Sequence, residues 1–292
     1  MSQKSLLQKT AIITGASSGL GFEISKAFLK AGSNLIICSR SEKDLAIALE
    51  KLNELKDERQ KIFSLPTDIS NEKDVDNLIN ESYKRFNKIE ILVNNAGIIG
   101  PKGNFEDLNW DQWKYALEIN FLGSAYLVKK LIPQFKKNNF GRIIQISGGG
   151  ATSPLPLQSI YAASKAAIVR FIETVSLEVK EFNITANCIA PGQLNTRIMN
   201  EYIDAGPEKI GQSFYLKVQK QFKSGGAPIS KAVNLALALA TEEFPILRGK
   251  LISAIWDDWE NFTKYEKELN SSDVYSLRRI IAKDRNFEWG DL

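Results

Sequence analysis

The chain has 292 residues, of which 43% are apolar and 25% charged, a balance typical of a folded globular protein with a substantial core. It contains no histidine, which excludes Ser-His-Asp and Cys-His catalysis and metal sites built on imidazole, so we expect no bound metal. The net charge is only +4, and basic and acidic residues are interleaved, so we expect no nucleic-acid partner.

Three further features of the sequence indicate the cellular compartment of the protein. No apolar run reaches the length of about 18 residues that a membrane span needs. Residues 1–10 lack the apolar stretch of a secretory leader. Cys38 and Cys188 both lie within apolar runs, as buried reduced thiols do. These features predict a cytoplasmic protein without a membrane partner.

Short runs rich in Ile, Leu and Val alternate with amphipathic helical stretches along most of the chain. The strand-like runs are 10–14, 34–39, 61–66, 89–97, 142–147, 184–192 and 249–255. The helical stretches are 19–31, 41–57, 71–86, 111–138, 158–181 and 231–241, whereas 193–227 is less regular. Apolar strands without clean alternation suit a parallel sheet covered on both faces. The pattern predicts an α/β fold, a Rossmann-like doubly wound parallel sheet of about seven strands with helices on both faces.

No linker or repeat interrupts this pattern, so we expect residues 1–292 to form a single domain with a core over 8–255 and a helical extension over 256–292. Aromatic side chains recur at near-helical spacing in the extension, at Trp256, Trp259 and Phe262, which favours core or subunit packing. Arg278 and Arg279 could pair with Asp257 and Asp258 at the surface, or they could face a phosphate or carboxylate of a substrate.

A glycine-rich turn, TGASSGLG at residues 14–21, lies between the first strand and the first helix. Glycine lets the backbone turn tightly and approach a pyrophosphate, which then sits at the N-terminus of the helix. Glycine is also common in ordinary turns, but the strand–turn–helix context favours phosphate binding. The turn therefore predicts a dinucleotide site.

The end of the second strand should reach the adenosine ribose of that dinucleotide. Ser39 and Arg40 stand there, where a protein that binds NAD places Asp or Glu on the ribose hydroxyl. A guanidinium binds a 2′-phosphate that a carboxylate would repel. NADP(H) is therefore favoured over NAD(H), although Arg40 could instead be a surface residue that opens a loop.

Two Tyr-x-x-x-Lys pairs occur, Tyr126 with Lys130 and Tyr161 with Lys165. Residues four apart share one face of a helix. A phenol with a pKa near ~10 is a poor acid or base at neutral pH, and a neighbouring ammonium favours the phenolate and lowers that pKa. The spacing alone does not decide which pair takes part in chemistry.

With these residues assembled, the chain resembles the short-chain dehydrogenase/reductase family over residues 8–255. The resemblance rests on five features in order: TGASSGLG at 14–21, NNAG at 94–97, Asn120, YAASK at 161–165 and PGQLNT at 191–196. It implies that Tyr161, which follows the fifth strand, is the catalytic tyrosine. Tyr126 falls in the long helix before that strand, where packing or a subunit interface is the expected role.

The resemblance also implies a role for each matching residue. Tyr161 would exchange a proton with the substrate, Lys165 would bind the nicotinamide ribose and lower the Tyr161 pKa, and Asn120 would hold a water that links Lys165 to solvent. The cofactor would contact Tyr161, Lys165 and these residues: Gly15, Ser17, Ser18, Gly19, Leu20 and Gly21 at the phosphates; Ser39 and Arg40 at the adenosine ribose; Asp68 and Ile69 at the adenine; Asn95, Ala96 and Gly97 along the adenosine ribose; and Pro191, Gly192, Leu194 and Thr196 at the nicotinamide half. In purely structural roles, Asp68 could cap a helix and Asn120 could satisfy a kinked helix backbone.

The chain departs from the family at the serine that orients the substrate carbonyl. That serine lies thirteen positions before the tyrosine, where this chain has Gly148. Ser147 comes one position early, which in a regular strand points a side chain to the opposite face. Because three consecutive glycines favour irregular backbone, we expect a local bulge that turns Ser147 inward as the donor. The alternative donors are Thr152, Ser153, Gln193 and the backbone N–H groups of the glycines. Glycine at 148 could instead make room for a bulkier substrate that brings its own polar groups.

The resemblance implies an NADP(H)-dependent oxidoreductase that transfers a hydride between nicotinamide and a small-molecule carbonyl or alcohol. Reduction of 3-oxoacyl thioesters and oxidoreduction of sugars or polyols use the same machinery and stay open as alternatives. Gly148 also leaves open an NADP(H)-binding regulatory module with little turnover. Relatives commonly pair through helices that correspond to 111–138 and 158–181, so a homodimer or homotetramer is expected.

Overall fold

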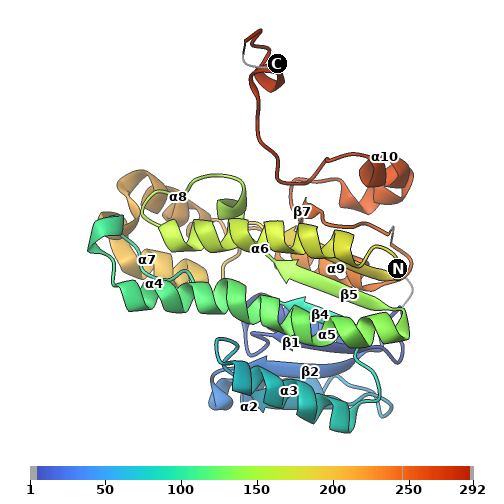
Figure 1. The fold of residues 1–292 in the computed structure, drawn as a ribbon. Helices are drawn as coiled ribbons and strands as arrows, with labels where there is room; N and C mark the ends of the chain where they lie inside the picture. Colours follow the sequence, from blue (N-terminus) through green and yellow to red (C-terminus); the bar gives the residue numbers. More distant parts are fainter. Residues whose placement is uncertain (1–4, 245, 290–292) are drawn as a thin grey trace.

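A computed structural model describes residues 5–244 and 246–289, and within them a single parallel sheet of seven strands has the order β3-β2-β1-β4-β5-β6-β7 (Figure 1). The strands are β1 (Thr10–Thr14), β2 (Asn34–Ser39), β3 (Ile62–Pro66), β4 (Ile91–Asn94), β5 (Gly141–Ile146), β6 (Ile184–Ala190) and β7 (Leu251–Ser253). The sheet confirms the Rossmann-like fold that the alternation of strands and helices predicts.

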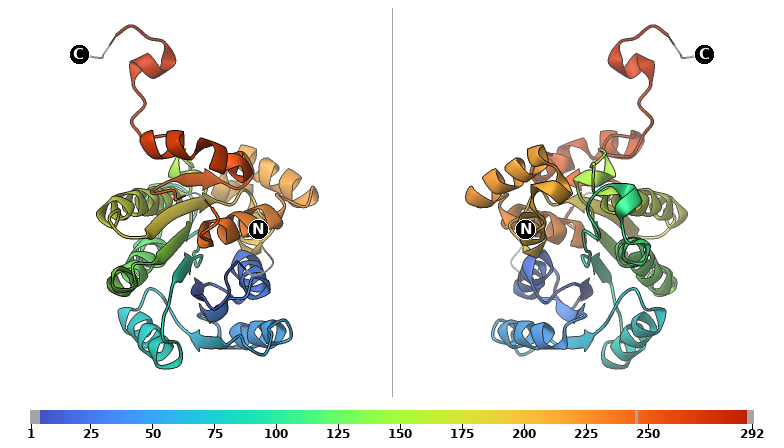
Figure 2. Two further views of the ribbon diagram at one scale, coloured as in Figure 1. Left: turned by 90° about the vertical axis from the view of Figure 1, so that its right-hand side faces the viewer. Right: turned by 90° about the vertical axis from the view of Figure 1, so that its left-hand side faces the viewer.

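Helices cover both faces of the sheet (Figure 2). On one face lie α1 (Gly19–Lys30), α2 (Glu42–Asn53) and α9 (Ile229–Ala240), which pack into one apolar cluster. On the other face lie α3 (Glu72–Arg85), α5 (Ser124–Asn138) and α6 (Ser159–Glu178), which pack into a second cluster. Successive strand residues supply both clusters, since Ile12 faces the second and Ile13 the first. This explains why the strands are apolar throughout rather than alternating.

The long helix expected over 111–138 is interrupted in the structure. It consists of α4 (Trp110–Leu117), a π-helical turn over Glu118–Gly123, and α5. The extra residue of a π-turn redirects the side chains that follow, and such turns are frequent at functional sites. Here the turn carries Asn120, which is 1% exposed, toward the end of β4.

The segment 193–227, which has the least regular sequence pattern, contains two helices. They are α7 (Arg197–Ile210) and α8 (Gln212–Lys223), and they pack against each other. Gly206 has a φ of 72° that breaks the helical path before Pro207, and Gly211 has a φ of 82° between the two helices. These breaks divide the apolar period into pieces too short for the sequence pattern to show.

The pair formed by Tyr126 and Lys130 has a structural role. Tyr126 donates from its hydroxyl to Asp76 at 3.1 Å, and Lys130 forms an ion pair with the same carboxylate at 2.7 Å. Asp76 lies on α3, so the contacts of Tyr126 and Lys130 with it link α5 to α3 at the surface. This agrees with the packing role expected for Tyr126.

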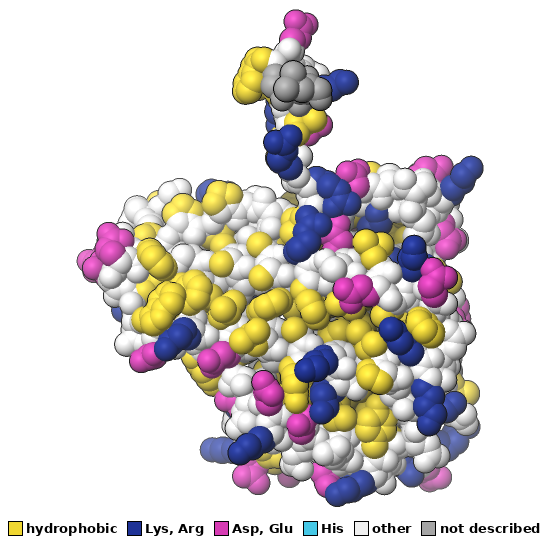
Figure 3. Space-filling view, viewed as in Figure 1, with side chains coloured by type: hydrophobic (Ala, Val, Ile, Leu, Met, Phe, Trp, Pro, Cys, Tyr) yellow, Lys and Arg dark blue, Asp and Glu magenta, His cyan; other side chains and the backbone are white. Residues whose placement is uncertain are grey.

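An apolar band crosses the face formed by α5 and α6 in the view of Figure 3. It includes a hollow of about 710 Å³ whose lining includes Leu122, Tyr126, Ile132, Pro133, Phe171 and Val175. Among the helices of the described residues, none combines the length and the apolar character needed to cross a membrane.

The segment after β7 folds back onto the body of the protein. Trp259 and Phe262 are 4% and 2% exposed and pack into the apolar cluster beneath α9 and α1. Farther along, the carbonyl of Tyr275 accepts a hydrogen bond of 2.7 Å from Leu251 N at the edge of β7. This much of the extension is therefore continuous with the core.

The described part of the extension has three short helical pieces, a 3₁₀ stretch over Trp259–Tyr265, α10 (Glu266–Ser271) and a 3₁₀ turn over Ala282–Arg285. Arg278 forms ion pairs with Glu173 of α6 at 2.7 Å and with Asp273 at 3.1 Å. Arg278 thus pairs with acidic residues, but its partners are Glu173 and Asp273 and not the expected Asp257 and Asp258. Residues 279–289 then project away from the body, with Phe287 54% exposed (Figure 1).

The two phenylalanines of the extension give a matched test of this packing. Phe262→Ala should lower the free energy of unfolding by about 3–5 kcal/mol, because it empties a buried site. Phe287→Ala should change it by less than about 0.5 kcal/mol, because this side chain is exposed. Urea denaturation of the full chain measures both values. Equal effects would contradict the packing described for Phe262.

Candidate active site

The loops that follow β1, β2, β3, β4, β5 and β6 enclose one cavity of about 1350 Å³, here called the central cavity. The carboxyl ends of parallel strands meet at one edge of a sheet, where a doubly wound fold places its ligand site. The sequence-predicted residues that line this cavity are Gly15, Ser17, Ser18, Gly19, Leu20, Ser39, Arg40, Asp68, Ile69, Asn95, Ala96, Gly97, Ser147, Tyr161, Lys165, Pro191, Gly192, Leu194 and Thr196. Gly21 and Asn120 do not line it and lie behind its wall.

The glycine turn is built to let backbone approach the cavity closely. Gly15 has a φ of 63°, and a Cβ there would lie 2.9 Å from the Cα of Ala96. Asn95 holds the turn in place, because its side-chain amide donates to the carbonyls of Thr14 at 2.9 Å and Gly15 at 3.2 Å. A side chain at Gly21 would strike that same amide. Asn95 therefore holds the glycine turn in place, in addition to belonging to the turn that ends β4.

The N-terminus of α1 opens onto this turn. Ser18 occupies the N-cap position with extended backbone, and its side chain makes no capping hydrogen bond. The first N–H groups of a helix lack partners within the helix and carry a partial positive charge. The turn and the uncapped helix therefore fit an anionic group such as a pyrophosphate.

A hydrogen-bonded chain closes the far end of the cavity. Arg40 donates from Nη1 to the hydroxyl of Tyr115 at 2.8 Å, and that hydroxyl donates to Asp68 Oδ2 at 2.9 Å. Partial burial would raise the pKa of Asp68, but hydrogen bonds from Ser70 and Tyr115, with the charge of Arg40, outweigh it and lower that pKa. Tyr115 lies within the predicted helix, and no signal in the sequence singles it out.

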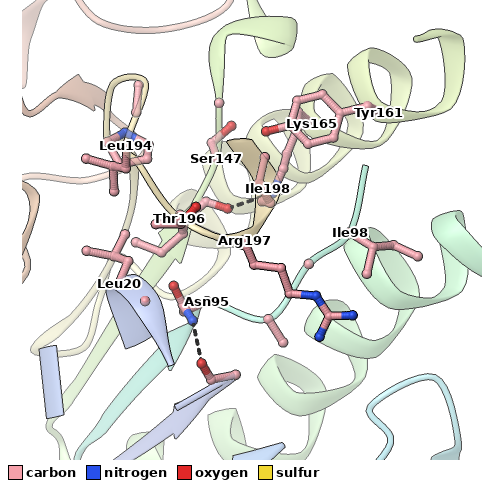
Figure 4. A pocket seen from close by; sticks show the side chains of 18 of the residues that line it. Leu20, Asn95, Ile98, Ser147, Tyr161, Lys165, Leu194, Thr196, Arg197 and Ile198 are labelled. Atoms are coloured by element: carbon pink, nitrogen blue, oxygen red, sulfur yellow. Dashed lines mark hydrogen bonds between the residues drawn. The ribbon is translucent and has the colours of Figure 1, made fainter. Parts of the chain in front are cut away.

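Tyr161 and Lys165 lie side by side on α6 and line the cavity, as the helical spacing predicts (Figure 4). Lys165 is 5% exposed, its Nζ donates to the carbonyl of Ile146 at 3.2 Å, and it lies 5.6 Å from the centre of the Tyr161 ring. Burial lowers the pKa of Lys165 to about 8. The Tyr161 ring is half-buried, with its hydroxyl end turned inward.

The pKa of Tyr161 is not lowered, although its neighbour Lys165 was expected to lower it. Burial raises this pKa to about 12. The physical reason is that desolvation penalises the phenolate, whereas the Lys165 ammonium is itself held to Ile146. Tyr161 is thus a neutral phenol at physiological pH in this structure.

Asn120 braces the loop after β4 instead of facing the cavity. Its Oδ1 accepts from Ile98 N at 2.9 Å, and its Nδ2 donates to Ile98 O at 2.8 Å and to Ser164 Oγ at 3.1 Å. Gly97 separates it from the lysine, since a Cβ there would lie 3.1 Å from Asn120 Oδ1 and 3.6 Å from Lys165 Nζ. The backbone that Asn120 satisfies is therefore this loop, not the kinked helix.

Gly148 lies directly against the phenol of Tyr161. A Cβ at Gly148 would lie 2.7 Å from the Tyr161 hydroxyl oxygen. Ser147 keeps the hydrogen bond of the sheet, donating from N to Ile189 O at 2.8 Å, and Gly148 is extended, so the expected bulge is not found between them. The Ser147 hydroxyl is nevertheless buried at the cavity wall and finds no hydrogen-bond partner among the described residues.

Residues that sequence reasoning did not single out form one wall of the central cavity. Four side chains of α7 and α8 make what is here called the apolar wall: Met199, Tyr202, Phe214 and Val218. Met199 and Tyr202 are three residues apart and Phe214 and Val218 are four apart, and this helical spacing is the sequence signal that could have identified them. The extension also reaches the cavity through Trp256, Asp257, Tyr275 and Ser276.

Comparison with known proteins decides the family. The sequence model described as short chain dehydrogenase matches residues 9–206. The chain belongs to the short-chain dehydrogenase family. Members of this family are oxidoreductases that act on alcohols and carbonyl compounds with a nicotinamide dinucleotide, so this short-chain dehydrogenase is an enzyme of that class.

Two curated relatives show the extent of this similarity. A protein of Arabidopsis thaliana named 11-beta-hydroxysteroid dehydrogenase-like 3 is 35% identical over 214 residues, which cover 73% of this chain and 67% of that protein. The D-beta-hydroxybutyrate dehydrogenase of Rhizobium meliloti (strain 1021) is 29% identical over 259 residues, which cover 85% of this chain and 97% of that protein.

Solved structures show the same fold. NAD⁺-bound xylitol dehydrogenase aligns with a TM-score of 0.78 at 21% identity, over 86% of this chain and 98% of that chain. A variant of actinorhodin polyketide ketoreductase with NADPH aligns with a TM-score of 0.76 at 23% identity, over 85% of this chain and 96% of that chain.

The buried lysine of this short-chain dehydrogenase predicts a pH-dependent stability. The Lys165 pKa is about 8 folded and near 10.5 unfolded, so the unfolded chain binds more protons between these values and wild-type stability rises with pH there. Lys165→Met removes a desolvation cost of about 3 kcal/mol at pH 7. The variant should therefore be the more stable at pH 7, and its advantage should shrink toward pH 10.

Chemical denaturation of both proteins at pH 7, 8, 9 and 10 measures this difference. Lys130→Met is the matched control, because Lys130 is only half-buried and its partner Asp76 raises its pKa. This control should give no gain in stability at pH 7. If the difference in unfolding free energy between Lys165→Met and the wild type stays constant with pH, the burial of a charged lysine is contradicted.

Proposed function

We propose that this chain is an NADP(H)-dependent oxidoreductase that transfers a hydride between nicotinamide and a carbonyl or alcohol, with Tyr161 as general acid and base. The observation that carries the proposal is that the Tyr161 hydroxyl, the Lys165 ammonium and the glycine turn line one cavity. A dinucleotide spanning from the turn to the lysine would bring its reactive ring beside the phenol.

The residues fit the cofactor on physical grounds. The uncapped N-terminus of α1, with Ser17 and Ser18, would hold the pyrophosphate, and the positive φ of Gly15 and Gly19 forms the turn that leads into this helix. Asp68 and Ile69 would flank the adenine, Ser39 and Arg40 the adenosine ribose, and Pro191, Gly192, Leu194 and Thr196 the nicotinamide half. When bound, the cofactor supplies or accepts the hydride.

The chain's own residues would handle the proton. Tyr161 is a neutral phenol, and a neutral phenol can donate a proton to the oxygen of a carbonyl as it is reduced. Lys165 can donate a hydrogen bond to the ribose of the cofactor from the position where Ile146 holds it. We propose Ser147 as the remaining donor for the carbonyl oxygen, because its buried hydroxyl has no other partner in the described part of the chain.

The proposed preference for NADP(H) rests on Arg40. Its guanidinium is exposed at the rim of the cavity, beside Ser39 and Ser41, and the hydrogen bond to Tyr115 leaves its other donors free for a phosphate. Related structures contain either NAD⁺ or NADPH, so family membership alone does not select between them.

The relatives' names support a carbonyl or alcohol substrate, since they include a hydroxysteroid dehydrogenase-like protein and a hydroxybutyrate dehydrogenase. Gly148 is the one observation that favours a different class of function, a module that binds NADP(H) with little turnover. Binding of NADPH without oxidation by any ketone or aldehyde in a panel would support that module.

The proposed role of Tyr161 predicts a specific loss. Tyr161→Phe should lower kcat by about 10²–10⁴-fold, because the proton donor is removed, while the dissociation constant for NADPH changes little. Steady-state kinetics and NADPH fluorescence titration measure the two quantities. Tyr126→Phe, at the other Tyr-x-x-x-Lys pair, should keep wild-type kcat. Full activity in Tyr161→Phe would refute the proposal.

The proposed role of Arg40 predicts a change in cofactor preference. Arg40→Gln should lower kcat/KM for NADPH by roughly 10- to 100-fold, because a charge-assisted contact to the 2′-phosphate is lost. The value for NADH should stay within about twofold. Arg59→Gln, an exposed arginine outside the cavity, is the control and should change neither value. An equal loss with both cofactors would contradict the assignment.

We also propose that copies of the chain pair through the apolar band of α5 and α6 to form a homodimer or homotetramer. Leu122, at the edge of the 710 Å³ hollow, is 50% exposed on this band. Leu122→Glu should shift the protein toward monomers in sedimentation velocity, because it places a charge in the contact. Leu216→Glu, at an equally exposed leucine of α8, should not. Unchanged assembly in Leu122→Glu would contradict this interface.

A further inference from the structure

The apolar wall stands close to the proposed proton donor. Met199, Tyr202 and Val218 are 4%, 7% and 2% exposed and belong to one apolar cluster, against which Tyr161 and Phe214 pack. The Phe214 and Tyr202 rings meet edge to face, with centroids 5.2 Å apart. A substrate whose oxygen reaches Tyr161 therefore has this wall beside the rest of its body.

The polar atoms near the wall are largely engaged with the protein itself. Tyr202 donates from its hydroxyl to Gln158 Oε1 at 2.5 Å. Gln221 donates its amide to Gln193 O at 2.7 Å, and Glu201 forms an ion pair with Arg197 at 3.6 Å. A polyol would bring several hydroxyls to this wall, and each one buried without a partner costs roughly tenfold in affinity or more.

Two glycines leave room next to the phenol. A side chain at Gly148 would meet the Tyr161 hydroxyl, so its absence keeps that approach open. At Gly149, a Cβ would find nothing within 4 Å. The open space is continuous with the central cavity of about 1350 Å³, which the cofactor and the substrate would share.

From this arrangement we infer that the substrate is a bulky apolar carbonyl compound or its alcohol, such as a fused-ring or branched alicyclic ketone, and not a sugar or polyol. The inference rests on the proposed function and names the substrate class of the same site. Its body would lie on the apolar wall, with the carbonyl oxygen at Tyr161 and the space beside Gly148 and Gly149 taking the ring next to the carbonyl.

The test compares three ketones that differ in apolar bulk and hydroxylation. Full-length protein with NADPH is assayed with cyclohexanone, 2-decalone and xylulose. Each buried methylene should raise kcat/KM about fourfold, so 2-decalone, with four more carbons, should exceed cyclohexanone by roughly 250-fold. Xylulose should be the poorest of the three. Equal values for the two cyclic ketones, or a preference for xylulose, would overturn the inference.

A binding measurement separates this inference from the proposed function. Calorimetry with decahydro-2-naphthol and with xylitol, on protein saturated with NADPH, reports binding without turnover. Binding of the naphthol but not xylitol, with no ketone reduced, would support the substrate class and contradict the proposed function. Turnover of cyclohexanone or xylulose without a gain for 2-decalone would support the proposed function and contradict the substrate class. No binding of the naphthol and no turnover would contradict both.

A matched pair of variants on α8 locates the effect. Phe214→Ala should lower kcat/KM for 2-decalone by about 10-fold and leave cyclohexanone within about twofold, because only the larger ring reaches this side chain. Phe222→Ala is the control, since Phe222 is 47% exposed on the same helix and lies outside the cavity. Equal losses for both ketones in Phe214→Ala would contradict the contact.

Discussion

The buried ammonium of Lys165 is the constraint on which the rest of the site depends. It donates to the carbonyl of Ile146 at the end of β5, and no carboxylate of residues 5–244 or 246–289 forms an ion pair with it. An unpaired buried charge is costly, so burial holds its pKa near 8. A group kept at such a cost, at the edge of a sheet where ligands bind, is typical of a functional site.

The surrounding elements shape the cavity in which that lysine and its tyrosine lie. The π-helical turn lets Asn120 hold the loop at Ile98, and this loop places Gly97 between Asn120 and Lys165. On the other side, α7 and α8 close the cavity with the apolar wall. Burial keeps the phenol of Tyr161 neutral, and a neutral phenol is able to donate a proton to the oxygen of a carbonyl.

The sequence was informative where a residue's identity is dictated by backbone geometry or by burial in a parallel sheet. Gly15 could be placed because only glycine tolerates its φ and its approach to Ala96, and the apolar strands because both faces of the sheet are covered. The sequence did not predict α7 and α8, whose period Gly206 and Gly211 break, nor the link from Arg40 to Asp68 through Tyr115. The pKa of Tyr161 was predicted in the wrong direction, because burial is set by tertiary packing and not by the residue four positions away.

The most direct measurement of the central claim follows the hydride itself. Reduction of 2-decalone is run with NADPH that carries deuterium on one face of C4, and then with the opposite face labelled, and the alcohol product is analysed by mass spectrometry. The account predicts one deuterium at the carbinol carbon from one labelled face and none from the other. Oxidation of NADPH with no deuterium in the product from either face would contradict direct hydride transfer at the cavity of Tyr161 and Lys165.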